Sequence, residues 1–277
     1  MAHSNSVYDS SRKVSIFRDT FVSFWDHRDL ISLLARSDLT VRYKRSFLGL
    51  LWTLLNPLLT SFVLWFIFVY IFRPKLPDNT QFAPYLLAGV LTITFFTQGL
   101  TLAADSIANG APILQKIYVP PQVFALAAAF SSAVNFFFGL IALTFVTLIT
   151  GDGMSFLFPL TVLVIFCMLL LVTGLGLMTS ILYIRFDDTR NLITILLSLM
   201  TYLTPVFYPK EILKPIVYNV VSLNPITSYL DVFRFVFAST GTATLFDWLY
   251  MFGSAITIFI IGIRVFVKQW PKTVVML

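Results

Sequence analysis

The sequence predicts an all-α integral membrane protein with six transmembrane helices, an N-terminal amphipathic interfacial helix and outer re-entrant helices before the last span. Three observations support this fold class. The composition is 58% hydrophobic and 12% charged, with a mean hydropathy of +0.86, whereas soluble domains average about 25% charged residues. Long uncharged runs recur along the chain. The basic residues gather beside alternate ends of these runs, which is the charge pattern that orients membrane proteins.

Six uncharged runs are candidates for crossing the bilayer, which takes about 20 helical residues for about 30 Å of hydrocarbon. We expect helices and not open strands, because backbone groups cannot stay unpaired in lipid. The third run contains Pro120 and Pro121, and its helix should start near Pro121 because proline suits a first turn. The sixth run is short, so flanking residues should extend it, with Arg264 reaching the interface. The runs cover residues 49–72, 82–104, 117–151, 153–184, 191–209 and 248–263.

The basic residues predict that both termini are cytoplasmic. Eight of the 19 lysines and arginines precede residue 49, six more lie at run ends on that same side, and five lie on the other side. Cytoplasmic loops of membrane proteins carry the excess of Lys and Arg. We therefore predict a multi-pass protein of the inner (plasma) membrane. It should have a cytoplasmic tail with an interfacial helix at 1–48, a transmembrane domain at 49–268 and a cytoplasmic C-terminus at 269–277.

Three stretches differ from plain spans. Residues 20–47 mix large apolar side chains at helical spacing with charges, which predicts an amphipathic helix at the cytoplasmic interface. Residues 107–120 form a short, proline-stiffened cytoplasmic segment. Residues 209–245 are too apolar for an ordinary loop but too short and interrupted to cross the membrane. Irregular backbone at membrane depth must be buried in protein or line a wet cavity, so this region should be re-entrant and cap the outer end.

The sequence offers no arrangement typical of catalysis, metal binding or nucleic-acid binding. Its two histidines, His3 and His27, lie in the tail, and its single cysteine, Cys167, fits a small core residue. The net charge of +6 is explained by membrane orientation. The first five spans have no acidic residue mid-span, which argues against a proton- or sodium-coupled carrier. Transport energy would then come from another subunit.

Charged residues near the spans have simpler interpretations. Asp231 and Arg234 are three residues apart and should be able to pair on one helical face. The mixed cluster between the fourth and fifth spans is interpreted as a solvated turn with local ion pairs. It consists of Arg185, Asp187, Asp188 and Arg190.

Three segments resemble the ABC-2 type permeases of polysaccharide export. They are residues 39–59 (LTVRYKRSFLGLLWTLLNPLL), 85–89 (YLLAG) and 224–234 (NPITSYLDVFR). The resemblance implies export of O-antigen, teichoic acid or galactan carried on a polyprenyl lipid. It also implies a homodimer, two copies of a separate ATPase that hold ATP and Mg, and no cofactor on this chain. The permease dimer would enclose a channel with aromatic rims, and the three irregular stretches match the family's interfacial, coupling and re-entrant helices.

The resemblance also suggests site residues, each of which has a plainer alternative. Aromatic rings offer sugar rings flat contact at low entropic cost, although each ring taken alone is better explained by packing or lipid contact. The channel candidates are Trp52, Trp65, Phe66, Tyr70, Tyr202, Phe207 and Tyr208. Candidates for the lipid pyrophosphate are Arg42, Lys44 and Arg45, each of which taken alone is better explained by ordinary membrane anchoring. Candidates for ATPase coupling are Ile113, Leu114, Lys116 and Tyr118.

Two other functions are weighed against polysaccharide export. A small-molecule or drug exporter of the same superfamily fits the topology but not the first segment or the outer region. An integral-membrane enzyme acting on lipid-linked sugars lacks a carboxylate or histidine cluster, since the outer acids are scattered.

Overall fold

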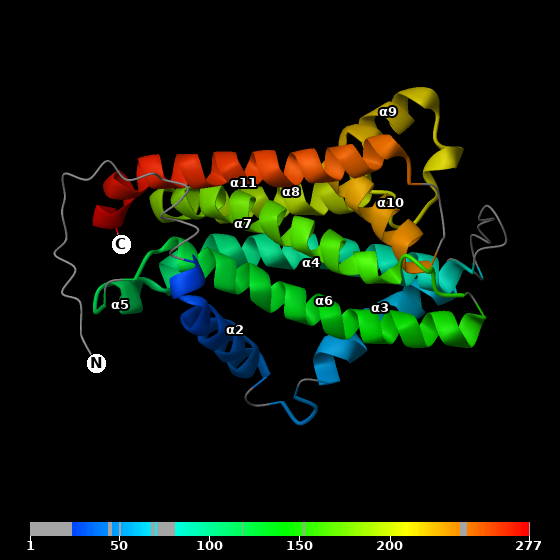
Figure 1. Cartoon of the computed structure of the whole chain (residues 1–277), viewed down its shortest axis with the longest axis horizontal. Helices are drawn as coiled ribbons and strands as arrows, with labels where there is room; N and C mark the ends of the chain where they lie inside the picture. Colours follow the sequence, from blue (N-terminus) through cyan, green and yellow to red (C-terminus); the bar gives the residue numbers. More distant parts are fainter. Residues whose placement is uncertain are drawn as a thin grey trace.

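The computed structural model is a bundle of long apolar helices that run side by side (Figure 1). It describes residues 24–43, 46–49, 51–67, 70, 81–117, 119–151, 153–238 and 243–276, with the backbone alone at 42, 43 and 211. Within these residues every regular element is helical. The α-helices are α2 Arg28–Tyr43, α3 Leu51–Ile67, α4 Phe82–Asn109, α5 Ala111–Leu114, α6 Gln122–Thr150, α7 Thr161–Arg185, α8 Thr189–Leu203, α9 Pro215–Leu223, α10 Pro225–Ala238 and α11 Leu245–Thr273. Short 3₁₀ turns lie at η3 Phe158–Leu160, η4 Lys210–Ile212 and η5 Val274–Met276.

Among the described residues, four helices are long and apolar enough to cross a membrane. They cover Phe82–Leu114, Gln122–Thr150, Phe158–Arg185 and Leu245–Met276. The chain is therefore a multi-pass membrane protein, as the composition predicts. Helices α3 and α8 fall where the first and fifth spans are predicted, but they have 17 and 15 residues.

Prolines and caps set several helix ends. Helix α8 ends at Leu203, earlier than the predicted run, because Thr204 precedes Pro205 and adopts an extended ψ of 135°. Helix α6 ends at Gly151, whose φ of 80° glycine adopts without strain. Helix α11 begins with a capping box between Thr244 and Asp247. Helix α11 continues to Thr273, well past the predicted apolar run of residues 248–263. Its last turns carry charged residues and remain helical.

The two ends of the bundle differ. Figure 1 shows α5 and the C-terminal end of α11 at one end, and α9 and α10 at the other. Helix α2 lies obliquely against α6, where the Ser131 hydroxyl donates a 2.6 Å hydrogen bond to Asp38. Asn224 separates α9 from α10 because it precedes Pro225 and is extended, with ψ of 116°. We call the α5 end the inner end and the α9–α10 end the outer end.

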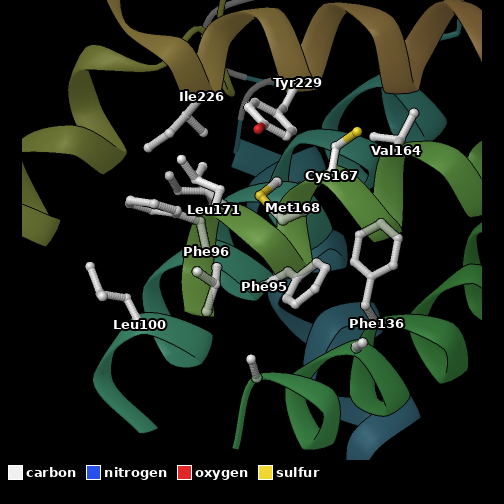
Figure 2. Packing of buried hydrophobic residues seen from close by; sticks show 14 of the residues in the cluster. Phe95, Phe96, Leu100, Phe136, Val164, Cys167, Met168, Leu171, Ile226 and Tyr229 are labelled. Carbon is white, nitrogen blue, oxygen red and sulfur yellow. The ribbon is translucent and has the colours of Figure 1, made fainter. Parts of the chain in front are cut away.

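Helices α4, α6, α7 and α10 share a core of interlocking aromatic and aliphatic side chains (Figure 2). The rings of Phe95 and Phe136 lie 5.3 Å apart, and Phe136 is also 5.3 Å from Phe233. Lipid is as apolar as this core, so helix association depends on close packing. A Cβ on Gly174 would lie 2.7 Å from the Ile258 carbonyl oxygen, so α7 and α11 approach closely here. The absence of a side chain at Gly174 therefore permits the close packing of these two helices.

Candidate functional site

A polar cavity lies between α3, α4 and α6 and has a volume of about 450 Å³. One part of its wall consists of rings, and Figure 2 shows two of them, Phe95 and Phe136, among the buried side chains of the core. The other part carries carboxamide side chains, one from each helix. These are Asn56 of α3, Gln98 of α4 and Asn135 of α6. The cavity therefore combines ring faces with hydrogen-bonding groups at the middle of an apolar bundle.

A second hollow, of about 390 Å³, lies between α4 and α8 and is more open. Several of its hydroxyls donate to carbonyls of their own helix, as Thr194 does to Arg190 at 2.8 Å and Ser198 to Thr194 at 2.9 Å. Their oxygens keep lone pairs that face the hollow. Gln98 lines both hollows, so the polar surface is continuous along one side of α4. The hydroxyl-bearing lining residues are Thr97, Thr101, Thr194, Ser198 and Thr201.

The predicted channel aromatics form two separate groups. On α3, Trp52 lines the first cavity and Trp65 packs partly against the core. Phe66 and Tyr70 are exposed, with ring centroids 4.7 Å apart. The second group lies at the outer end of α8 and just beyond it. There Tyr202 is exposed, Phe207 and Tyr208 are half-buried, and the Tyr208 hydroxyl donates to the Tyr202 carbonyl at 3.2 Å.

The predicted basic and coupling residues are only partly described. Arg42 lies in the last turn of α2, and its side chain, like Lys44 and Arg45, falls outside the described part. Helix α5 presents Ile113 at the inner end, with Leu114 half-buried beneath it and Lys116 exposed after it. Tyr118 also falls outside the described residues.

Charged residues join the inner ends of the long helices. The Arg190 guanidinium lies 2.9 Å from the Asp105 carboxylate, which joins the start of α8 to α4. Arg185 of α7 donates to Gln269 at 2.9 Å and to Thr273 at 3.2 Å, both on α11. The interpretation of this cluster as a turn with local pairs is therefore wrong for Arg185 and Arg190, which bind across helices. Sequence spacing alone could not identify partners 84 residues away.

A buried polar network holds the outer end. The Arg234 guanidinium donates to the carbonyls of Pro205, Tyr85 and Val206 at 3.0, 3.1 and 3.1 Å. It also stacks over the Tyr85 ring at 3.5 Å. Asn224 donates to the Thr204 hydroxyl at 2.9 Å. These contacts fix α10 against the start of α4 and the segment after α8.

Lys210 and Asp231 form a second part of this network, with an N–O distance of 2.7 Å and about a tenth of each side chain exposed. Burial alone lowers the pKa of Lys210, but the adjacent Asp231 carboxylate outweighs it and raises that pKa. Helical spacing allowed Asp231 to pair with Arg234, but the hydrogen-bonded ion pair of Asp231 is with Lys210. Burial raises the pKa of Asp231, although the charges of Lys210 and Arg234 both favour its ionised form.

Comparison with known families supplies the identity that fits this geometry. The family model described as ABC-2 type transporter matches residues 29–238. The chain belongs to the ABC-2 type transporter family. The ABC-2 region begins in α2 and ends with α10, so it contains both hollows and the outer network.

Curated relatives of this ABC-2 chain match most of its length. Two proteins of Klebsiella pneumoniae named O-antigen export system permease protein RfbA are 25% and 26% identical, each over 87% of this chain and 92% of the relative. A Myxococcus xanthus protein of the same name is 27% identical over 77% of this chain and 82% of the relative.

Family membership makes this chain a membrane transport subunit and not an enzyme. The polar hollows of the ABC-2 bundle suit that role, because their amides and hydroxyls bind polar solutes without titrating near neutral pH. Sequence reasoning missed these hollows. The available signal was an uncharged amide within each of three predicted spans, at Asn56, Gln98 and Asn135, which a search for intramembrane charges does not detect.

Proposed function

We propose that this chain is the membrane-spanning subunit of an ABC exporter that moves lipid-linked polysaccharide out of the cytoplasm. The observation that carries the proposal is the agreement of the ABC-2 family match with relatives named as O-antigen export permeases over nearly their full length. Their names favour an O-antigen-type glycan on a polyprenyl lipid over teichoic acid or galactan. A drug exporter or a lipid-linked-sugar enzyme is less well supported, since no relative compared carries such a name.

The energy source in this proposal is a separate ATPase subunit. The membrane chain would form a homodimer and bind two ATPase copies, which hold ATP and Mg while this chain holds no cofactor. Helix α5, with Ile113 exposed at the inner end, is the contact we assign to the ATPase, together with Leu114, Lys116 and Tyr118. ATP would act by favouring one of two channel states through differential affinity.

In this proposal the chain lies in the inner (plasma) membrane. Helix α5 and both termini are on the cytoplasmic side. Helices α3 and α8 would complete six spans, and residues 209–245 would be re-entrant, with α10 buried and α9 exposed. Helix α2 would lie in the cytoplasmic interface, beside membrane lipid. Arg42, Lys44 and Arg45 would then be near the lipid pyrophosphate as it enters.

The glycan in this proposal passes the two groups of aromatic rings and the hollows between them. Rings give sugar faces contact that is weak and repeated, which lets a polymer slide. The rings are Trp52, Trp65, Phe66 and Tyr70 near α3, and Tyr202, Phe207 and Tyr208 at the outer end of α8.

A deletion strain tests the proposed function directly. Loss of the chain should remove a polysaccharide from the cell surface and accumulate it, lipid-linked, inside the cell, and the restored wild-type chain should reverse both effects. An ATPase subunit should also co-purify with the tagged chain in mild detergent and hydrolyse ATP. Unchanged surface polysaccharide, with no ATPase in the purified sample, would contradict the proposal.

A further inference from the structure

The three amides of the first cavity carry hydrogen-bonding capacity that the protein does not use. In the part of the chain that the structure describes, the Asn135 Oδ1 atom is buried without a hydrogen-bond partner. Gln98 lies exposed near the middle of the span Phe82–Leu114, most of which is buried. Asn56 is exposed on the facing side of α3. Lipid tails cannot bind these groups, and polar side chains at such depth normally face a partner or a wet cavity.

The chemistry of the cavity wall indicates what would bind there. A carboxamide offers two N–H donors and an acceptor oxygen, so each amide can bind a pair of neighbouring hydroxyl groups. The rings of Trp52 and Phe95 border the same space and present apolar surface. Among the residues that the structure describes, no lysine, arginine, aspartate or glutamate lines the cavity. The site therefore suits a neutral, hydroxyl-rich ligand with an apolar face, and its 450 Å³ lies within the usual range for small-molecule sites of about 300–1,000 Å³.

We propose that this cavity is a hydrogen-bonding subsite for a sugar unit of the transported glycan, held by Asn56, Gln98 and Asn135 against the Trp52 ring. The inference rests on the proposed function and adds to it a polar contact at mid-membrane, in addition to the aromatic rings. Gln98 also borders the α4–α8 hollow, so a sugar leaving the amides next meets the hydroxyls of Thr194 and Ser198. The polar path thus continues from one hollow to the next.

A photo-crosslinking experiment in export-competent cells tests the subsite. Trp52 is replaced by p-benzoylphenylalanine, a ring of comparable size, in the deletion strain. The control carries the same residue at Phe166, which is 55% exposed on α7 and lines neither hollow. Irradiation should attach glycan to the chain at position 52 and not at position 166. Adducts only with lipid, or only with a second copy of the chain, would overturn the subsite.

Substitutions then distinguish the contribution of the amides to glycan binding from that of the aromatic rings. Gln98→Leu and Asn135→Leu keep side-chain size but remove the hydrogen bonds, so each should lower the glycan adduct about tenfold. Asn191→Leu, an exposed amide at the inner end of α8, should leave it unchanged. Gln98→Asn should restore part of the loss. Unchanged adduct yield in both leucine variants would overturn the role of the amides.

Two controls keep this test independent of folding and of the proposed function. No hydrogen bond in the described chain depends on Gln98 or on the Asn135 oxygen, so both leucine variants should unfold at the wild-type temperature. A lower unfolding temperature together with lost adduct would assign the amides a structural role and overturn the subsite. If wild type restores surface polysaccharide but position 52 gives no glycan adduct, the subsite alone fails. If wild type restores none, the proposed function fails first.

Discussion

At the residue scale, Arg234 donates to three backbone carbonyls, two of which, those of Pro205 and Val206, lie outside any helix. Pro205 and Val206 follow the end of α8, and the Tyr85 carbonyl lies in the first turn of α4, where the guanidinium reaches all three. Only a planar group with several fixed donors can bind carbonyls in three directions while stacking on a ring. The residue is 3% exposed, so these hydrogen bonds do not compete with water.

Arg234→Met should therefore destabilise the protein by about 3 kcal/mol, because it leaves buried carbonyls without donors. Arg234→Lys should destabilise the protein less than Arg234→Met, because an ammonium group can still donate to a carbonyl but cannot span all three acceptors. Thermal unfolding of the purified protein in detergent measures both. Lys268→Met, on the exposed side of α11, is the matched control and should change little. Equal unfolding temperatures for Arg234→Met and wild type would contradict this account.

Lys210→Met should cost about 2 kcal/mol, because it removes a charged hydrogen bond from the buried Asp231 carboxylate. The double variant Lys210→Met/Asp231→Leu should recover most of the loss.

The pKa of Lys210 is raised above its ordinary 10.5 in the folded protein. The stabilisation that Lys210 provides is therefore fully present below pH 10.5 and is lost as the pH rises through the raised pKa of Lys210. Denaturant unfolding at pH 8 and above pH 11 checks this, and a difference between wild type and Lys210→Met that persists undiminished would oppose it.

Sequence reasoning at this scale identified charges better than their partners. It placed Asp231 and Arg234 on one helix, where helical spacing made them the obvious pair. The structure gives each a nearer partner from the segment after α8, at a sequence distance that spacing cannot reveal. The amides Asn56, Gln98 and Asn135 were passed over because each is neutral and only their convergence on one cavity makes them notable.

At the element scale, α7 and α11 pack with their backbones almost in contact. A Cβ on Gly262 would collide with the carbonyl group of Gly174, whereas a Cβ on Gly253, also on α11, would meet nothing within 4 Å. Small residues at such crossings give the dispersion contacts on which membrane helices depend.

Gly262→Ala should destabilise the bundle by about 1–3 kcal/mol, because it forces the two helices apart. Gly253→Ala, in the same helix, should be neutral or stabilise by about 0.5–1 kcal/mol through helix propensity. Thermal unfolding of both variants measures the two effects, and Gly253→Ala is the control for Gly262→Ala. A similar response of the two glycines would show that close packing of α7 and α11 does not limit stability.

Ile113→Asp should weaken co-purification of the ATPase at least about tenfold, because it puts a charge in the apolar contact we assign to α5. Ile212→Asp makes the same change at an exposed position of the outer end, beyond reach of a cytoplasmic partner. Its ATPase yield should match wild type. If both variants retain the ATPase, α5 is not the contact.

Hydropathy located the elements well where the run is both apolar and uninterrupted, as for α4 and α6. It misjudged the end of α8, which stops before Pro205. The expected extension of the sixth run by flanking residues is confirmed, since α11 keeps its helix through Arg264, Lys268 and Pro271. Charge ends an apolar run but not a helix, whereas Pro205 ends α8 without ending the apolar run.

At the scale of the whole molecule, the proposed topology places the inner end of the bundle in the cytoplasm and the outer end on the other side of the membrane. Cys167 is the chain's one cysteine and is buried, so Cys167→Ala provides a thiol-free background. A membrane-impermeant maleimide should label Phe156→Cys and Ile216→Cys in intact cells. Val275→Cys should react only after permeabilisation. Labelling of Val275→Cys from outside, or none of Ile216→Cys, would reverse or break the six-span topology.

Helix α8 is attached to the rest of the molecule mainly at its two ends. Arg190 holds its start to Asp105 of α4, and Thr204, just beyond its end, binds Asn224. Between these two attachments Leu197 is the buried residue of α8, while Ile193 and Met200 pack against the core from half-buried positions. A helix with few buried side chains between two fixed ends bends most easily at its middle. In the proposed exporter, bending of α8 away from α4 would enlarge the hollow beside Gln98 for a branched sugar while both attachments stay in place.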